Sequence, residues 1–442
     1  MWLSDGRRAV RARVGDRRSA RGRRGEKGPG VTVQPIAGEP ARRRRPHRSG
    51  GALALLLGSM LLLVTACGGD EADGGKASGK AGSDRAASQA EVAIAPKDGA
   101  DGVATSGALE VTAKRGRLKS VKVTDPKGNA VAGKISGGGA SWRPSGHLGA
   151  STEYTVDAVA VDAKGREAAE HAKFTTLVPK NTFIGQYSPE NGQQVGIGMP
   201  VSIRFSRGIT HPEAVEDAIK VTAEPSVPIA GHWFGNDRLD FRPEKYWAAG
   251  TRITVRLDLD GVEGRPGVYG TQAKTVAFTI GRSQVSTVDA RTKMMTVVRD
   301  GKKIKSIPIT SGAPGTETYN GQMVISEKHP VTRMNGDTVG FGGQYDIKDV
   351  PHAMRLSTSG TFIHGNYWSG RDAFGTRNAS HGCVGLFDVR GGGDASTPAA
   401  WFFDHSQIGD VVIVKNAHDE TIQPDNGFGD WNLSWEKWTA GR

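Results

Sequence analysis

Cysteine is almost absent from this sequence, whose 442 residues include only Cys67 and Cys383. At most one disulfide bond can form, which excludes a fold stapled by several. Long helical patterns are also lacking, because the periodic stretches are short, while glycine is abundant at 62 residues. This combination favours strands joined by turns. The length allows roughly three domains of about 100–150 residues each.

A long apolar run is missing as well. The run GALALLLGSMLLLV at residues 51–64 is shorter than the about 20 residues that span a bilayer. Following the arginines at 42–45, it has the length of a signal-peptide core. The next residues, Thr65, Ala66 and Cys67, resemble a bacterial lipobox. That resemblance implies a diacylglycerol on Cys67 and a mature chain that starts there. A plain transmembrane anchor and an ordinary cleaved signal are the alternatives.

The leader and its lipid site therefore occupy residues 1–67 in this interpretation. Residues 68–90 are mostly Gly, Ala, Ser, Asp and Lys, with little to bury, and we expect a flexible linker. If Cys67 is lipidated, Cys383 is a single thiol in an oxidising compartment. Such a thiol is open to oxidation and tends to persist where chemistry needs it.

The positive charge is concentrated in the leader. The chain carries 58 Lys and Arg against 46 Asp and Glu, and residues 1–48 hold 15 of the former and 4 of the latter. The remainder is almost neutral. Nucleic-acid binding needs clustered positive charge on the folded domain, so we expect no nucleic-acid partner.

An internal repeat with an offset of 99 residues precedes the C-terminal part of the chain. Trp142-Arg143-Pro144 matches Phe241-Arg242-Pro243, and the alternating segments 152–156 and 251–255 match each other. A period near 100 residues is the size of one immunoglobulin-like sandwich. We therefore expect two tandem β domains, at residues 91–178 and 179–282. A spacer role is favoured for them over glycan binding.

Candidate catalytic residues gather around Cys383. The segment Ser380-His381-Gly382-Cys383 follows His364 by fewer than twenty residues. A thiol attacks acyl groups as a thiolate, so it needs a base or a positive field nearby. Gly382 allows a sharp turn, which lets backbone amides approach a developing oxyanion.

This segment resembles the active-site signature of the L,D-transpeptidases with a YkuD-like fold, and the similarity extends over residues 284–415. Asp300-Gly301 between two strand-like runs resembles the family's opening hairpin, and residues 408–414 resemble its last strand. Thr397-Pro398 has the pattern of an N-cap and first helical position. The resemblance implies a mostly β protein. Two immunoglobulin-like sandwiches would precede a β-rich catalytic domain at 283–415 with few helices and a short tail at 416–442.

The family's roles carry over by matching positions. Cys383 resembles the nucleophile and His364 its general base, oriented by the backbone of Gly365. The amides of His381, Gly382 and Cys383 would form the oxyanion hole. The remaining matched positions are Ser380 in the signature and, for substrate binding, Met354, Arg355, Tyr345 and Asn366. The segment between His329 and His352, with Arg355, resembles a lid over the substrate.

Two positions depart from the family's pattern. Gly385 stands where Arg or Asn is common, which removes a side-chain hydrogen bond. Tyr319 replaces a common proline. Both departures concern substrate details more than the chemistry.

The implied activity is formation of 3-3 cross-links between peptidoglycan stem peptides through a cysteine thioester. Stem tetrapeptides would be the substrates, and β-lactams of the carbapenem type would acylate the same thiol. No metal or organic cofactor is required. Lipid on Cys67 would hold the protein at the outer face of the cell membrane, in the cell wall.

Other interpretations stay open from the sequence. An L,D-carboxypeptidase would use the same thiol with water as acceptor, and a non-catalytic peptidoglycan-binding lipoprotein would use neither. His364, His381 and Cys383 are also residue types that bind zinc, and His381 alone could be a buried structural histidine.

The tail contains three tryptophans, Trp431, Trp435 and Trp438. Their spacings of four and three suit one face of a short helix. We expect this face to pack on the catalytic domain, with a glycan-gripping surface as the alternative.

Overall fold

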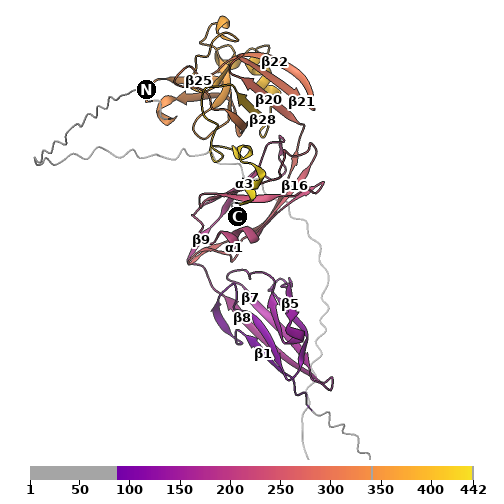
Figure 1. Ribbon diagram of the computed structural model, residues 1–442. Helices are drawn as coiled ribbons and strands as arrows, with labels where there is room; N and C mark the ends of the chain where they lie inside the picture. The colour runs from indigo at the N-terminus through magenta and orange to yellow at the C-terminus, as the bar shows by residue number, and fades with distance from the viewer. Residues whose placement is uncertain (1–86, 340–341, 441–442) are drawn as a thin grey trace, which may run out of the picture. The chain divides into compact units, whose positions relative to one another are not determined.

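The computed structural model describes residues 87–339 and 342–440 (Figure 1). The leader at 1–67, the lipidation site Cys67 and residues 68–86 of the expected linker lie outside the described residues. Within the described part, no helix is both long and apolar enough to cross a membrane. The fold is mostly β, as the sequence predicts.

The first immunoglobulin-like sandwich pairs two four-stranded sheets, ordered β1-β3-β6-β5 and β2-β8-β7-β4. Strand β7 shows why the sequence folds this way, because alternate residues from Tyr154 to Ala160 are buried and their neighbours face outward. That period of two gives a strand one apolar face. The strands are β1 (Glu91–Ala95), β2 (Ala100–Val103), β3 (Glu110–Lys114), β4 (Arg117–Thr124), β5 (Gly133–Ser136), β6 (Ser141–Pro144), β7 (Glu153–Val161) and β8 (Glu167–Thr176).

The second sandwich repeats this arrangement. Its sheets are ordered β10-β12-β15-β14 and β11-β19-β16-β13, and a small sheet β17-β18-β9 lies at one end. The elements are β9 (Asn181–Phe183), β10 (Gly185–Ser188), β11 (Gln194–Val195), β12 (Val201–Phe205), α1 (Pro212–Asp217), β13 (Ile219–Glu224), β14 (Ala230–Phe234), β15 (Arg238–Arg242), β16 (Arg252–Asp258), β17 (Glu263–Arg265), β18 (Val268–Gly270) and β19 (Ala273–Ile280). Repeat partners occupy equivalent strands, β6 with β15 and β7 with β16. The internal repeat is therefore structural.

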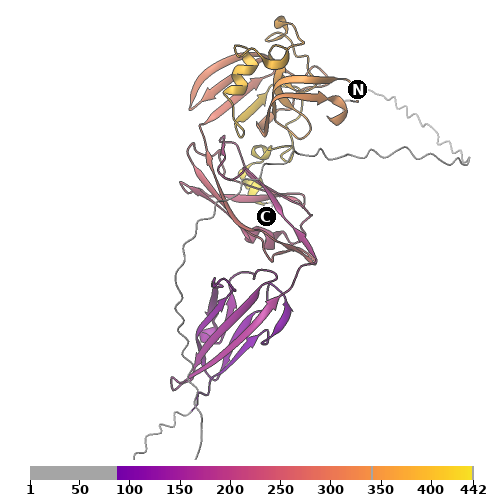
Figure 2. The same cartoon turned by 180° about the vertical axis from the view of Figure 1, so that it is seen from behind.

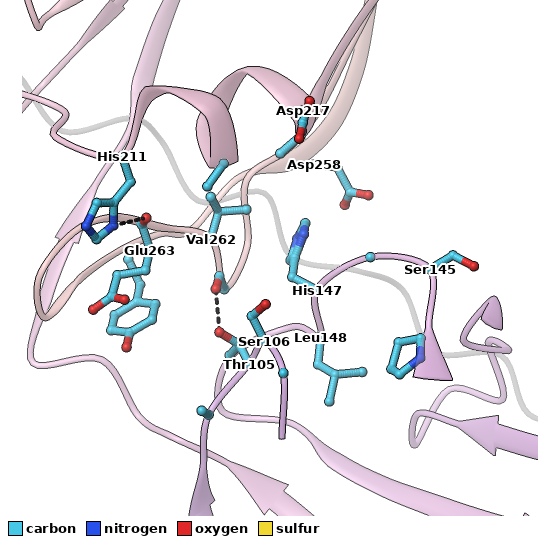
Figure 3. Close-up of a pocket in the computed structure, with 18 of the residues that line it drawn as sticks. Thr105, Ser106, Ser145, His147, Leu148, His211, Asp217, Asp258, Val262 and Glu263 are labelled. Atoms are coloured by element: carbon cyan, nitrogen blue, oxygen red, sulfur yellow. Dashed lines mark hydrogen bonds between the residues drawn. The ribbon is translucent and has the colours of Figure 1, made fainter. Parts of the chain in front are cut away.

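Loops of the two sandwiches meet around a pocket of about 860 Å³ (Figure 3). The Thr105 hydroxyl donates to the carbonyl of Gly261 at 2.7 Å, and His211 Nδ1 lies 3.1 Å from the Glu263 carbonyl. His147 and Asp258 also line the pocket.

The expected catalytic domain is built on one nine-stranded sheet, ordered β23-β28-β20-β21-β22-β27-β26-β25-β24. The strands are β20 (Gln284–Asp289), β21 (Met294–Arg299), β22 (Lys302–Thr310), β23 (Gly321–Val324), β24 (Glu327–Asn335), β25 (Asp346–Arg355), β26 (Phe362–Asn366), β27 (Val384–Phe387) and β28 (Val411–Lys415). Asp300 and Gly301 turn the chain between β21 and β22, as expected. Strands β26 and β27 are parallel neighbours, and they carry the candidate site.

Helix α2 (Pro398–Asp404) packs its apolar side on this sheet through Ala399 and Phe402. Thr397 is its N-cap and accepts a hydrogen bond from the Ala400 N–H at 3.2 Å, while Pro398 occupies the first helical position. The predicted helix start is confirmed. The missing N–H of proline costs nothing there.

The C-terminal tryptophans do not share one helix, which corrects the expectation. Trp431 lies in the 3₁₀ turn η5 (Asp430–Asn432), and α3 (Trp435–Ala440) begins after it. Trp438 is fully buried, its Nε1–H donates to the Ala230 carbonyl at 3.0 Å, and its ring stacks on His232. Helix α3 therefore packs on the second sandwich, beside β14, and not on the catalytic domain (Figures 1 and 2). The apolar side of α3 is therefore buried by side chains of the second sandwich, a domain that lies earlier in the chain.

Buried charges accompany this contact, in a group we call the tail clasp: Arg238, Asp240 and Arg242 of β15 with Asp430 and the three tail tryptophans. Arg238 donates two hydrogen bonds to Asp240, at 2.8 and 2.5 Å, and one to Asp430 at 3.3 Å. The Arg242 guanidinium lies 4.2 Å from the centre of the Trp438 ring and 4.8 Å from that of Trp431.

The tail clasp shifts two of its pKa values in a way that burial explains. Burial lowers the pKa of Arg242 to about 10, so the group stays charged at neutral pH. Burial and the neighbouring Asp240 raise the pKa of Asp430 well above its usual range. Since Arg238 is already paired with Asp240, we infer that Asp430 holds a proton and donates it to that carboxylate.

Candidate active site

Ser380 fixes the loop that leads to Cys383. Its hydroxyl donates to the Cys383 carbonyl at 2.5 Å and accepts from the Gly382 N–H at 3.2 Å. Its own backbone N–H donates to the Ser311 carbonyl at 3.0 Å. Gly382 has φ of +109°, a conformation that L side chains rarely adopt. The sharp turn expected at Gly382 is therefore present.

The sheet brings the segments that carry Cys383 and His364 together. Strands β26 and β27 are parallel, with Ile363 opposite Val384 and His364 opposite Gly385. Cys383 directly precedes β27 and lies two residues before Gly385. Side chains two apart on a strand share a face, and neighbouring strands are about 4.8 Å apart. Cys383 itself lies outside β27, in the bend after Gly382, and its sulfur contacts the Gly360 carbonyl at 3.6 Å. The strand pairing therefore brings the backbones of Cys383 and His364 to neighbouring positions.

The His364 ring is held by two contacts. Its Nδ1 lies 2.9 Å from the Gly365 carbonyl, so Nδ1 carries the proton and donates it, which leaves Nε2 as the basic nitrogen. The Trp368 ring stacks on it, with centroids 5.6 Å apart and planes inclined by 22°. His364 is buried, and burial lowers its pKa below the usual value.

Cys383 is a neutral thiol in this state. Burial raises the pKa of the Cys383 thiol to about 11, and the Phe362 N–H and the Arg355 charge oppose that rise only in part. Its Sγ lies 3.6 Å from the Gly360 carbonyl, as a weak donor. Both members of the pair are thus uncharged before substrate binds, and the imidazole is in the form that can take a proton.

A pocket of about 290 Å³ lies near this site. Its lining includes Gly360, whose carbonyl contacts the Cys383 sulfur, with Phe362 and Tyr345, but neither Cys383 nor His364. The lid strand β24 contributes Arg333 and Met334 to its wall. Two arginines line this pocket, and each is paired with an acidic side chain, Arg333 with Asp346 and Arg355 with Glu327.

The structure places only some of the expected substrate-binding residues at the pocket. Arg355 faces the pocket and pairs with Glu327 at 3.0 Å. Tyr345 packs against His381 with ring centroids 5.1 Å apart, and burial, followed by the nearby Cys383, raises its pKa to about 12. Met354 instead lies in the hydrophobic core with no exposed surface. The structure does not bring Met354 to the pocket, because β25 turns that side chain to the inner face of the sheet.

Asn366 is also buried and has a local structural task. It accepts a hydrogen bond from the Ser369 N–H at 3.0 Å and donates one to the Ser369 hydroxyl at 3.1 Å. These bonds fix the turn that places Trp368. At Gly385, where the family pattern departs, a Cβ would lie 2.8 Å from the Thr310 side chain and 3.2 Å from Asn366 Nδ2. Neighbours occupy the space that a longer side chain would need.

The sequence patterns did not predict several residues of the site. Trp368 covers His364, and His352 pairs with the buried Asp388 at 2.7 Å, behind Gly365. An aromatic residue four positions after His364 was a weak signal for the first. No spacing in the sequence relates His352 to Asp388, since the contact depends on sheet pairing.

Metal binding was an open alternative. In residues 87–339 and 342–440, no three side chains of His, Cys, Asp or Glu are gathered so that they could hold a metal ion. The zinc alternative therefore finds no ligand set in that part of the chain.

Comparisons with known proteins agree with this architecture. Residues 100–263 match the model of a bacterial Ig domain, and residues 283–414 match that of the L,D-transpeptidase catalytic domain. The fold and its C-terminal domain thus define a transpeptidase-type enzyme preceded by immunoglobulin-like domains.

Two curated relatives match most of the chain. The chain is 34% identical to L,D-transpeptidase 2 of Mycobacterium tuberculosis over 397 residues, which covers 88% of this chain and 94% of that protein. It is 30% identical to L,D-transpeptidase 5 of the same species over 352 residues, covering 78% and 75%. A solved structure described as the LD transpeptidase LdtMt1 in complex with imipenem has a TM-score of 0.45 and 26% identity, and covers 54% of this chain and 100% of that one. The chain belongs to the L,D-transpeptidase family.

Proposed function

We propose that this protein forms 3-3 cross-links in peptidoglycan through a thioester on Cys383. The observation that supports the proposal is the parallel pairing of β26, which carries His364, with β27, which directly follows Cys383. The ring orientation supports it, since the Gly365 carbonyl holds Nδ1 and leaves Nε2 to accept the thiol proton.

In the first half-reaction, Cys383 Sγ gives its proton to His364 Nε2 and attacks the carbonyl carbon of the third stem residue. The bond from that carbon to the nitrogen of the terminal D-alanine breaks. The imidazolium returns its proton to the leaving amine. Of the three expected oxyanion donors, the Gly382 N–H is directed to the Ser380 hydroxyl. The amides of His381 and Cys383 would stabilise the oxyanion, at about 3 kcal/mol for each donor.

In the second half-reaction, the side-chain amine of a neighbouring stem attacks the thioester. The new amide bond forms as the carbon–sulfur bond breaks, and His364 moves the amine proton to the departing sulfur. Dividing one acyl transfer into two steps is the gain of covalent catalysis. The neutral resting pair fits this scheme, because the thiolate is formed only when an acyl group is there to receive it.

Mass spectrometry of the purified chain with imipenem tests the first step. We expect a covalent adduct on Cys383, which Cys383→Ala removes. An intact wild-type protein that forms no adduct would favour the non-catalytic wall-binding alternative. Incubation with two different stem tetrapeptides then separates cross-linked dimer from the tripeptide that an L,D-carboxypeptidase would release.

We extend the proposal to location. The lipobox-like residues before Cys67 support a lipid anchor at the outer face of the cell membrane, with the two sandwiches as a spacer towards the cell wall. Labelling with a radioactive fatty acid tests this, with Cys67→Ser as the control. Equal labelling of both forms would reject the anchor.

A further inference from the structure

A buried carboxylate lies behind the proposed base and has no part in the mechanism above. Asp388 follows β27, and its side chain has 0% exposed surface. A Cβ placed on Gly365 would lie 2.1 Å from Asp388 Oδ2 and 2.8 Å from its Cγ. The carboxyl group therefore fills the space that a side chain at position 365 would take. Glycine is required there because of Asp388.

Three donors from three segments hold this carboxylate. His352 Nδ1, from β25, lies 2.7 Å from Oδ2. The Thr397 hydroxyl, at the N-cap of α2, donates to Oδ1 at 3.0 Å, and the Val389 N–H donates to Oδ1 at 2.8 Å. A group fixed by so many elements has little freedom to move.

Asp388 is linked to His364 through Gly365. The carbonyl that accepts from His364 Nδ1 belongs to the same residue whose Cα lies against the carboxyl group. The negative charge of Asp388 raises the pKa of His364, while burial, the larger effect, lowers it. The other titratable groups around the pair are Cys383 and His381 before β27, with Tyr345 and Arg355 on the lid side.

We propose that Asp388, anchored by His352 and Thr397, is a positioning residue for His364. It holds the Gly365 peptide that orients the ring, and its charge stabilises the imidazolium formed when His364 takes the Cys383 proton. Asp388 itself stays unprotonated throughout, so the proton travels only from Sγ to Nε2. This inference rests on the proposed role of His364 as general base.

The test is the pH dependence of acylation by imipenem, measured by stopped flow for Asp388→Asn. The amide keeps the shape and removes the charge. We expect the rate to fall roughly tenfold and the acid limb of the profile to move down by roughly one pH unit, the effect of losing one nearby opposite charge. Asp404→Asn is the matched control, because Asp404 is an exposed carboxylate on α2.

A rate and profile for Asp388→Asn equal to those of Asp404→Asn would overturn the inference. A lower rate with an unmoved acid limb would also overturn it, since a purely structural role predicts that result. His364→Ala separates this from the proposed function: if His364→Ala still acylates normally, the general base itself is wrong.

A second pair of variants decides the matter if Asp388→Asn does not fold. His352→Gln keeps a donor towards Asp388, and His352→Leu does not, while both bear the same cost at the positive φ of +50°. We expect the glutamine variant to retain most of the acylation rate and the leucine variant to lose roughly tenfold. Equal rates for the two would overturn the inference.

Discussion

The Cys383–His364 pair and the tail clasp both bury polar side chains, and they differ in the charge that they carry. In the clasp, Arg238 and Asp240 are ionised and paired, and tryptophan rings enclose the neighbouring Arg242. In the active site, burial keeps both partners neutral. A pocket lined by Gly360 and Phe362 lies near the thiol.

This difference shows two ways in which a protein handles the free-energy cost of burying an ionisable group. Taking a charge out of water is expensive unless a partner stands ready. In the clasp the buried charges are paired throughout in the folded state, and these pairs join the tail to the second sandwich. In the active site the desolvation cost arises only during the reaction, because the thiolate and imidazolium form only with the reacting acyl group. Variants that exchange the two properties test this contrast.

The largest effect is expected at the thiol. Cys383→Ala should reduce imipenem acylation by at least about a thousandfold, since no other nucleophile takes its place. The free energy of unfolding should change by less than about 1 kcal/mol, because only a sulfur atom is lost. Adduct mass and chemical denaturation measure the two quantities. Residual adduct on the alanine variant would place the nucleophile elsewhere.

The clasp should respond in the opposite sense. Trp438→Ala removes a fully buried ring and should lower the free energy of unfolding by about 3–5 kcal/mol. Acylation by the folded fraction should be nearly unchanged. Trp368→Ala is the contrasting variant, since Trp368 is 44% exposed and covers His364. It should slow acylation and alter stability little. Equal stability losses in both variants would remove the distinction.

The two clasp carboxylates should also differ from each other. Asp240→Asn leaves Arg238 without its ionised partner and should cost about 3 kcal/mol. Asp430→Asn mimics the protonated acid and should be nearly neutral. Because the folded-state pKa of Asp430 is raised, its contribution is present at low pH and is lost as pH rises through that value. Denaturation midpoints across pH should fall with rising pH for the wild type more than for Asp430→Asn. A midpoint that rises instead would show that Asp430 is ionised.

The smallest effect concerns the acid limb of the activity profile. Burial lowers the pKa of His364 from its usual 6.5, so the basic form persists at lower pH than in a free imidazole. The acylation rate should therefore fall to half of its plateau only below pH 6.5. Stopped-flow measurement with imipenem between pH 4 and 8 checks this. A half-maximal rate above pH 6.5 would contradict the buried, neutral base.

Much of the architecture could be predicted from the sequence, because local patterns specify it. Alternating apolar residues define β7 and β16, and a repeat at 99 residues marks two copies of one sandwich. Thr397-Pro398 is a local signal, and α2 begins there. The positions of Met354 and Trp438 could not be predicted from the sequence. Which face of a strand is buried, and which domain the tail packs on, both depend on chain segments that are distant in the sequence.

The sequence by itself determined which residues are candidates for the chemistry. The unpaired Cys383, the glycine before it and the two nearby histidines are local features, and they favour a thiol with a base. Only the tertiary structure decided which histidine lies on the strand beside the Cys383 segment, which carbonyl orients its ring and which carboxylate lies behind it. Those relations join β25, β26, β27 and α2. Hydrogen bonding between strands that are far apart along the chain creates such contacts, and a linear pattern cannot contain them.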